Sequence, residues 1–337
     1  MEFLQKVQLA PYTTFALAAE TAWFCRVNEK AEISQALLFA YRNNLALMPL
    51  GSGSNLVLTR DFPGLIIKLD MAGIEKLDEG PSSVLVRMHG GQDWSSAVEY
   101  CLDHGWYGLE NLAMIPGTAG GAPVQNIGAY GLEISDRLVD LQAIETSTGL
   151  EKNFSSEQCG FGYRTSRFKK AQGRWIITSI TLRLRTHPMV DTHYGALDTE
   201  LERLKIQHPT PKDVYDAVCS IRRSKLPDPA KTPNVGSFFT NPVVDHEKFY
   251  GLKERFNDIV AFENKDGSVK IAAAWLIEKC GFKGVEQGQV GVHHLQPLIL
   301  VNKGQATAKQ VLALADQIKK SVEETFGISL EYEPRIL

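Results

Sequence analysis

The sequence has 337 residues, which predicts two or three domains at about 150 residues each. Its 44% hydrophobic and 22% charged residues are typical of a globular protein, and a net charge of −3 without long Lys/Arg runs argues against a nucleic-acid partner. No stretch reaches the ~18 apolar residues of a membrane helix, the N-terminus lacks a secretory signal, and five scattered cysteines form no C-x-x-C, so we expect a cytoplasmic protein without disulfides or bound metal.

The first predicted elements are a helix, two strands and a second helix. Residues 28–43 are typical of a helix, because Asn28 can cap it and apolar residues recur every four positions. The apolar run 45–50 predicts a buried strand, and a glycine- and serine-rich loop separates it from a second apolar run at 56–59. A further short helix is expected to begin after Asp93, which can cap it.

The rest of the chain changes character twice. Residues 138–185 indicate β-structure, with a hairpin and then a strand, 175–185, in which apolar and polar residues alternate. Helical patterning returns at 212–224 and again from Thr307, which begins a capping-box pattern. The last ten residues, 328–337, predict a terminal strand.

Helices and strands are mixed without a regular βαβ rhythm, so the sequence predicts an α+β fold rather than a doubly wound parallel sheet. We place boundaries near 70 and 206. These give three parts, 1–70, 71–206 and 207–337.

The first glycine-rich loop, "GSGSNL" at 51–56, matches only half of a dinucleotide-binding fingerprint. Leu56 replaces the third glycine, and a strand rather than a helix is expected to follow, so a Rossmann-type site is excluded. Successive backbone N–H groups in such a turn can still bind phosphate. A plain hairpin turn is an equally good interpretation of this loop taken alone.

The second loop, "GLENLAMIPGTAGGAPVQNIGAYG" at 108–131, is rich in glycine and poor in charge. A solvent-exposed linker would be more polar. Apolar residues beside closely spaced glycines indicate a buried segment whose backbone approaches a flat ligand. Two such loops fit the diphosphate of a dinucleotide held between them, and the residues alone do not specify which nucleotide.

With both loops on one chain, the sequence resembles the FAD-binding domain of the vanillyl-alcohol oxidase (PCMH) type and, more closely, the UDP-N-acetylenolpyruvoylglucosamine reductase family of peptidoglycan synthesis. The similarity continues through "FGYRTS", "KLPDP", "GSFFTNP" and "LEYEPR", nearly the whole chain. It implies a two-lobed FAD-binding domain and a C-terminal α+β substrate-binding domain.

The resemblance also implies the cofactor. Oxidases of the wider family often tether the flavin through a histidine near the first loop, and none stands there, so we expect FAD to be bound non-covalently. The implied FAD-binding residues are Gly51, Ser52, Gly53, Ser54, Asn55, Pro116, Gly117, Gly120, Gly121, Gln125, Asn126, Gly128, Ala129 and Tyr130.

Ser237, in "NVGSFFTNP", fits no standard nucleophile motif, since G-x-S-x-G is absent. Taken alone, a serine after a glycine is most simply a turn residue. In the family it resembles, this serine is a general acid that gives a proton to the carbon next to the substrate carboxylate. Phe238 and Phe239 would either exclude water from the reaction or belong to the core.

Two more catalytic residues follow from the resemblance. Arg164, otherwise a surface or salt-bridging arginine, would bind the substrate carboxylate, to which a guanidinium can donate two parallel hydrogen bonds. Glu333 would stabilise the enolate or assist proton delivery, whereas the pattern alone predicts a solvated strand edge. Tyr332 stands where proline is common in the family, so Glu331 remains an alternative to Glu333.

The substrate-binding residues rest on the resemblance too. Arg222 and Lys225 lie three apart near a helix end, where cations also complement the helix dipole. With Asn241 and Gln296 they would bind the diphosphate and carboxylate end of the substrate. Tyr194 resembles the mobile tyrosine loop that closes over substrate in the longer subclass, although a tyrosine beside a glycine has no such meaning by itself.

The implied activity is that of an NADPH-dependent FAD enzyme, a UDP-N-acetylmuramate dehydrogenase. It would reduce UDP-N-acetylglucosamine enolpyruvate to UDP-N-acetylmuramate, as a monomer acting on a small molecule. Two alternatives are a flavin oxidase of the same fold acting on an alcohol, and a flavin- or nucleotide-binding module without turnover.

Overall fold

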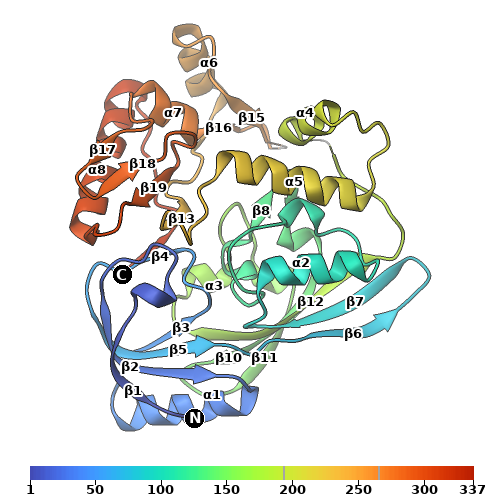
Figure 1. Cartoon of the computed structure of the whole chain (residues 1–337), viewed down its shortest axis with the longest axis vertical. Coiled ribbons are helices and arrows are strands. Elements are labelled where there is room, and N and C mark those ends of the chain that lie inside the picture. Colours follow the sequence, from blue (N-terminus) through green and yellow to red (C-terminus); the bar gives the residue numbers. More distant parts are fainter. Residues whose placement is uncertain (193, 265) are drawn as a thin grey trace. The chain divides into compact units, whose positions relative to one another are not determined.

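The computed structural model describes residues 1–192, 194–264 and 266–337. The chain forms two compact units, each of mixed helices and strands (Figure 1). Unit 1 comprises Met1–Val7, Thr21–Ser52 and Phe62–Ser224, and unit 2 comprises Gln8–Glu20, Gly53–Asp61 and Lys225–Leu337. The predicted α+β class is confirmed, and the finer division at 70 and 206 stays a prediction.

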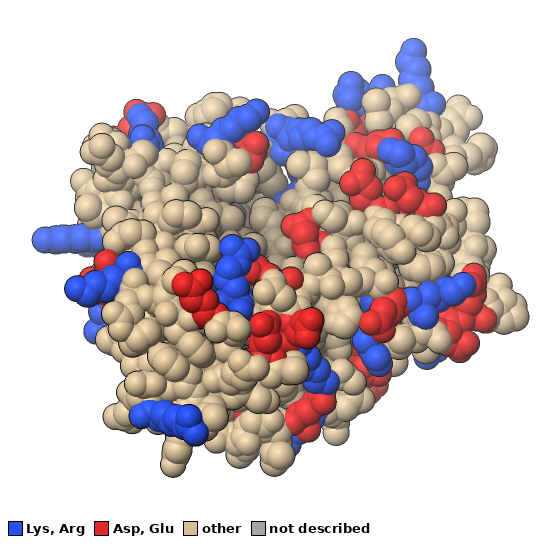
Figure 2. All heavy atoms as spheres, turned by 60° about the horizontal axis from the view of Figure 1, so that its bottom comes forward, with Lys and Arg blue, Asp and Glu red and all other residues tan. Residues whose placement is uncertain are grey.

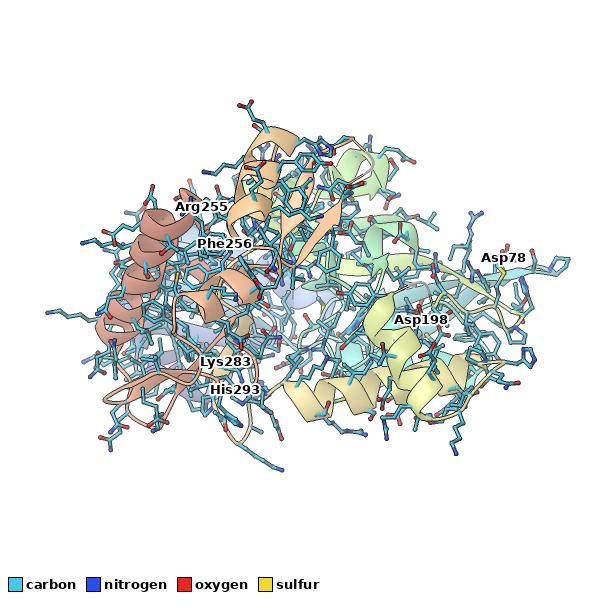
Figure 3. All side chains as sticks on the ribbon, turned by 90° about the horizontal axis from the view of Figure 1, so that it is seen from above. Asp78, Asp198, Arg255, Phe256, Lys283 and His293 are labelled. Carbon is cyan, nitrogen blue, oxygen red and sulfur yellow. The ribbon has the colours of Figure 1, made fainter. Side chains whose placement is uncertain are left out.

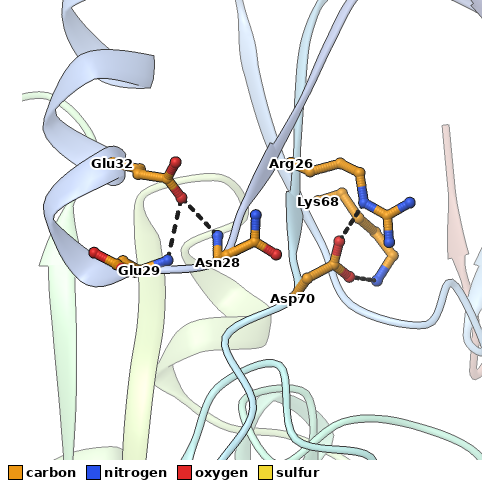
Figure 4. Close-up of polar contacts among 6 residues, drawn as sticks. All are labelled: Arg26, Asn28, Glu29, Glu32, Lys68 and Asp70. Atoms are coloured by element: carbon orange, nitrogen blue, oxygen red, sulfur yellow. Dashed lines mark hydrogen bonds and ion pairs between the residues drawn. The ribbon is translucent and has the colours of Figure 1, made fainter. Parts of the chain in front are cut away.

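One sheet of unit 1 has a parallel part, in which β2, β5 and β3 lie side by side. Asp70, just after β5, accepts hydrogen bonds from Arg26 Nε (2.6 Å) and Lys68 Nζ (2.9 Å), which ties the ends of β2 and β5 together (Figure 4). The strands in sheet order are β1 (Leu4–Gln8), β2 (Glu20–Val27), β5 (Phe62–Leu69) and β3 (Leu47–Leu50).

Helix α1 (Lys30–Arg42) covers this sheet, with Ile33 and Ala36 fully buried. Its cap is Glu29, so the prediction that Asn28 caps the helix is wrong. The carboxylate of Glu32 accepts the backbone N–H groups of both residues that precede the helix, as Figure 4 shows, and forms a capping box. These two hydrogen bonds lower the pKa of Glu32.

The second sheet of unit 1 is antiparallel, and the predicted hairpin connects β10 to β11. The strands in sheet order are β11 (Glu151–Ser155), β10 (Leu138–Glu145), β12 (Trp175–Arg185), β7 (Ser83–His89) and β6 (Ile74–Glu79). The first eight residues of β12 are all buried, although its sequence predicts alternating exposure. β12 is the central strand, and both of its faces are packed: Ile176 against the cluster that includes α1, and Ile177 and Ile180 against the cluster that includes α2 and α5.

Two further helices of unit 1 agree with their sequence signals. Asp93 caps α2 (Trp94–Asp103) by accepting the N–H of Ser96 at 2.8 Å, and α5 (Pro211–Lys225) buries Val214 and Val218. Other helices and strands of this unit are α3 (Arg167–Lys170), α4 (Gly195–Arg203), β8 (Gly128–Ala129) and β9 (Leu132–Glu133).

Unit 2 contains two small antiparallel sheets around one core, in which Phe256, labelled in Figure 3, packs at 5.8 Å from Trp275 and 5.0 Å from Phe326. The first sheet has β13 (Asn234–Ser237), β19 (Ile299–Asn302), β18 (Val290–Val292) and β17 (Glu286–Gln287), and the second has β14 (Val243–Val244), β16 (Val269–Ile271) and β15 (Ala261–Glu263). The helices are α6 (His246–Arg255), α7 (Ala273–Lys279) and α8 (Ala308–Phe326).

The end of the chain is the largest departure from the prediction. Helix α8 has the expected capping box at Thr307, but the predicted terminal strand is reduced to β20 (Arg335–Ile336), which pairs in parallel with β4 (Leu56–Val57). Before β20 the chain makes one bridge, from Tyr332 to Phe239. Pro334 follows, and since proline has no N–H to donate, strand pairing is interrupted there.

The face drawn in Figure 2 carries basic and acidic side chains intermingled rather than gathered by sign. This agrees with the near-neutral net charge. No helix in the described part of the chain combines the length and apolar character needed to cross a bilayer.

Candidate functional site

The start of the first glycine-rich loop lies against the second loop within unit 1. A Cβ added to Gly51 would stand 2.7 Å from the Thr118 Oγ1 atom, so a larger residue would have to displace the Thr118 side chain. The same hydroxyl accepts the N–H of Gly121 at 3.3 Å. The start of the first loop therefore packs directly against the second loop.

The middle of the second loop is fixed by backbone hydrogen bonds to neighbouring elements. The carbonyl of Gly117 accepts the N–H of Trp94, the first residue of α2, at 3.1 Å, and the N–H of Gly120 donates to Gly90 at 2.9 Å. Pro116, in the same loop, is exposed. This loop is thus held rigidly beside the start of α2.

The end of the second loop is organised by two residues in the left-handed region. Asn126 (φ 47°) is buried, and its side chain donates to Glu133 Oε2 (2.6 Å) and to the Gly162 carbonyl (3.2 Å). Arg164 (φ 52°) donates from Nη2 to the Gly128 carbonyl at 2.7 Å. The predicted catalytic arginine therefore lies directly beside the predicted cofactor loop. The Asn126 side chain stabilises the conformation of that loop through its hydrogen bonds.

Within unit 1, the predicted cofactor residue Tyr130 meets the predicted substrate residues Tyr194 and Arg222. The ring of Tyr130 packs edge-on against Tyr194, 5.6 Å between centroids, and its side chain is hydrogen-bonded to Arg222. Burial lowers the pKa of Arg222, and its buried Nε has no partner among the described residues. Tyr194 stands at the cap position of α4 and is 37% exposed. A cation that keeps a buried, unused donor is suited to an anionic ligand.

In unit 2, Ser237 is the last residue of β13 and pairs with Ile299 of β19. A register shift precedes it at Gly236, whose φ of 73° favours glycine. The Ser237 side chain is half-buried, and within the described residues its hydroxyl makes no hydrogen bond. Phe238 and Phe239 are 0% and 1% exposed, so they are core aromatics.

Glu333 lies beside this serine segment. Its N–H donates to the Phe238 carbonyl at 3.0 Å, and its carbonyl accepts Asn55 Nδ2 at 3.4 Å. Glu333 is half-buried, whereas Glu331 is exposed. Glu333 is therefore the less exposed of the two candidate carboxylates, and its catalytic role stays a prediction.

The second half of the first glycine-rich loop, Gly53 to Asn55, belongs to unit 2. A Cβ added to Gly53 (φ 64°) would stand 2.4 Å from the Tyr12 carbonyl, so this turn requires glycine. The Asn55 carbonyl accepts the N–H of Arg335 at 3.0 Å. The predicted cofactor loop is thus bonded to the chain end that carries Glu333.

The other three predicted substrate residues belong to unit 2. Asn241 accepts the N–H of Ala273 at 2.9 Å and so holds the start of α7. Gln296 lies in the loop between β18 and β19. Lys225 is exposed at the last position of α5.

Sequence reasoning missed three buried polar groups. Burial lowers the pKa of Arg335, and its buried Nε has no partner among the described residues. His293, in the loop after β18 (Figure 3), has a buried Nδ1 that likewise lacks a hydrogen-bond partner among the described residues. Glu110 is 4% exposed and accepts the Gly108 N–H at 2.9 Å, and burial raises its pKa. Two sequence signals could have identified two of them: the arginine that ends "LEYEPR", which is Arg335, and the single charged residue of the second loop, which is Glu110.

These groups fit a nucleotide cofactor. Within unit 2, the turn at Gly53 requires glycine, and backbone N–H groups in such a turn can bind phosphate. The N–H of Arg335 donates to Asn55 in this turn, and the buried Nε of Arg335 has no partner among the described residues. In the described part of the chain, no three His, Cys, Asp or Glu side chains are placed to bind a metal ion.

The α+β fold and the two glycine-rich loops agree with the FAD-binding class of proteins, and residues 21–154 match the family model of an FAD binding domain. Residues 228–337 match the C-terminal domain of UDP-N-acetylenolpyruvoylglucosamine reductase. The chain belongs to the UDP-N-acetylenolpyruvoylglucosamine reductase family.

Its relatives are similar along their whole length. The chain is 44% identical to the UDP-N-acetylenolpyruvoylglucosamine reductase of Chromobacterium violaceum and 42% identical to that of Pseudomonas aeruginosa, in each case over 100% of this chain and 99% of the relative. The crystal structure of the Thermus caldophilus reductase shares the fold, with a TM-score of 0.69 at 23% identity over 99% of this chain and 98% of that one.

Proposed function

We propose that this chain is an NADPH-dependent flavoenzyme that reduces the enolpyruvyl group of UDP-N-acetylglucosamine enolpyruvate, giving UDP-N-acetylmuramate for peptidoglycan synthesis. The full-length 44% identity to a reductase of this name carries the proposal. The reaction adds two electrons and one proton as hydride to one alkene carbon and a second proton to the other. A flavin alcohol oxidase and a module without turnover are less favoured.

Bound FAD would accept hydride from NADPH and pass it to the substrate. The chain would hold FAD non-covalently through backbone N–H groups of both glycine-rich loops. Arg335, whose N–H donates to the Asn55 carbonyl and whose buried Nε has no partner among the described residues, would supply a cationic donor to the cofactor.

Replacing Arg335 with methionine is therefore expected to weaken FAD binding by about 10- to 100-fold, the usual range for one charge-assisted hydrogen bond. Equilibrium titration of the apoprotein, followed by flavin fluorescence, measures this affinity without catalysis. Arg255→Met is the matched control, because Arg255 is exposed and lies over the Phe256 ring. A folded Arg335→Met protein with wild-type FAD affinity would exclude this role.

We assign Ser237 the proton donor's role. Its half-buried hydroxyl has no hydrogen-bond partner among the described residues and is therefore available to a ligand. The proton goes to the carbon next to the substrate carboxylate, where negative charge develops after hydride addition. Glu333 assists this delivery or stabilises the enolate.

Arg164 would bind the substrate carboxylate. Its hydrogen bond to the Gly128 carbonyl fixes the plane of the guanidinium, and this plane determines where a bidentate contact can form. The cation thereby stabilises the charge that develops during reduction.

Arg164→Lys is expected to lower kcat/KM for the enolpyruvyl sugar by about 10- to 100-fold, since an ammonium cannot replace the planar pair of donors. Steady-state NADPH oxidation at varied sugar concentration measures the change. Arg167→Lys serves as control, because Arg167 is exposed and contacts the Phe154 ring at 5.5 Å. Equal losses in both variants would argue against a carboxylate-binding role for Arg164.

The diphosphate and sugar would be bound by the remaining predicted residues: Tyr194, Arg222, Lys225, Asn241 and Gln296. Arg222 has the strongest structural support, because its buried Nε is without a partner among the described residues. We further propose that the protein is a cytoplasmic monomer.

The substrate dependence of NADPH oxidation tests the proposed function. We expect rapid NADPH consumption only when UDP-N-acetylglucosamine enolpyruvate is present, with UDP-N-acetylmuramate as product. Oxygen consumption with an alcohol would instead identify an oxidase. Bound FAD without any turnover would identify a binding module.

A further inference from the structure

Tyr332 links the C-terminal segment to helix α8. Its hydroxyl donates to Asp316 Oδ1 at 2.6 Å, and Lys319 Nζ lies 4.6 Å from its ring centroid. Burial, and then the hydrogen bond to Asp316, raise the pKa of this hydroxyl, so it keeps its proton and remains a donor through the neutral range.

The other contacts of Tyr332 are with the residues that follow the proposed proton donor. Its ring lies 5.5 Å from that of Phe238 and 5.7 Å from that of Phe239, and its backbone forms a bridge with Phe239. On either side of this bridge, Thr240 N–H donates to Glu331 and Glu333 N–H to Phe238, both at 3.0 Å. Residues 238–240 and 331–333 therefore form a short ladder centred on Tyr332.

This ladder carries both proposed reacting groups at one end. Ser237 immediately precedes Phe238, and Glu333 donates its N–H to the carbonyl of that phenylalanine. Helix α8 offers a fixed support, because it is capped at both ends and buries a continuous face. The Tyr332–Asp316 bond joins the ladder to that support.

We propose that Tyr332 and Asp316 are positioning residues, which hold the Ser237 hydroxyl and the Glu333 carboxyl in register for proton delivery. This inference rests on the proposed function. Proton transfer depends steeply on alignment, since a displacement of about 1 Å can cost on the order of 10²-fold in rate. A purely structural bond would instead affect folding and every partial reaction alike.

The test uses Tyr332→Phe, which keeps the ring contacts and removes only the hydroxyl. In rapid mixing with the FAD-loaded enzyme, we expect reduction by NADPH and FAD content to be unchanged. Oxidation of the prereduced enzyme by the enolpyruvyl sugar should slow by about tenfold. Asp316→Ala should have the same effect, and the double variant should be no slower, because both changes remove one interaction.

Tyr250→Phe on α6 is the matched control, since Tyr250 is exposed and stacks on His246. The proposal is overturned if Tyr332→Phe reacts with the sugar at the wild-type rate, if both partial reactions slow equally, or if the two effects add.

Amide hydrogen exchange gives a second readout that does not require activity. In Tyr332→Phe, the amides of Thr240 and Glu333 should exchange faster, because their acceptors lie across the ladder. Unchanged exchange would overturn the inference. A wild-type enzyme that the sugar cannot oxidise would refute the proposed function separately, while this exchange experiment would still test the ladder.

Discussion

Ser237→Ala is expected to slow oxidation of the prereduced enzyme by the enolpyruvyl sugar by about 10²- to 10⁴-fold, the usual cost of a lost general acid. Reduction of the enzyme by NADPH should be unchanged, because that step needs no proton from Ser237. The hydroxyl is half-buried at the end of β13 and has no hydrogen-bond partner among the described residues. Its removal therefore breaks no internal bond.

Rapid mixing of each half-reaction separately measures the two effects. Ser329→Ala is a suitable control, since Ser329 is exposed in the same unit. If both half-reactions slowed equally in Ser237→Ala, the serine would act only through the structure of the Gly236 turn.

Glu333→Gln is expected to lower the rate of sugar reduction by about 10²-fold or more, because an amide of the same shape cannot exchange a proton as a carboxyl does. The chain offers its own control two residues earlier. Glu331→Gln should leave the rate near that of the wild type, since Glu331 is exposed and only its backbone carbonyl takes part in the ladder.

The comparison of these two variants under saturating substrate decides which carboxyl is used. A large loss in Glu331→Gln with little effect in Glu333→Gln would reverse the assignment. Losses of similar size in both would indicate that the terminal segment contributes charge or shape rather than one reacting carboxyl.

Local sequence signals predicted local structure well. The capping patterns at Asp93 and Thr307 define the starts of α2 and α8, because a cap depends on residues within one turn. The prediction that Asn28 caps α1 was wrong, because the Glu32 side chain bonds back to the residues before the helix and Glu29 becomes the cap. Competition between two nearby side chains decides such cases.

Features that depend on distant segments were less predictable. The burial of β12 on both faces follows from its central place in the sheet. The terminal segment lost most of its predicted strand because its partner at 238–240 is short and Pro334 interrupts the pairing. The periodicity of a sequence does not show which distant segment a strand will pair with.

The same distinction between local and distant features applies to the residues of the candidate site. The family resemblance of the motifs implied roles for Ser237, Arg164 and Glu333. It did not predict the hydrogen bonds that hold these residues in place. The contact of Tyr130 with Tyr194 and Arg222 joins residues that are far apart in sequence. Arg335 escaped notice because its burial depends on the fold around β20.

The central claim is most directly tested by mixing the purified holoenzyme, without oxygen, first with NADPH and then with UDP-N-acetylglucosamine enolpyruvate. We predict that the yellow colour of oxidised flavin disappears with NADPH and returns only when the enolpyruvyl sugar is added, with formation of UDP-N-acetylmuramate. A protein that purifies without FAD, or one whose colour returns only with oxygen, would contradict the account.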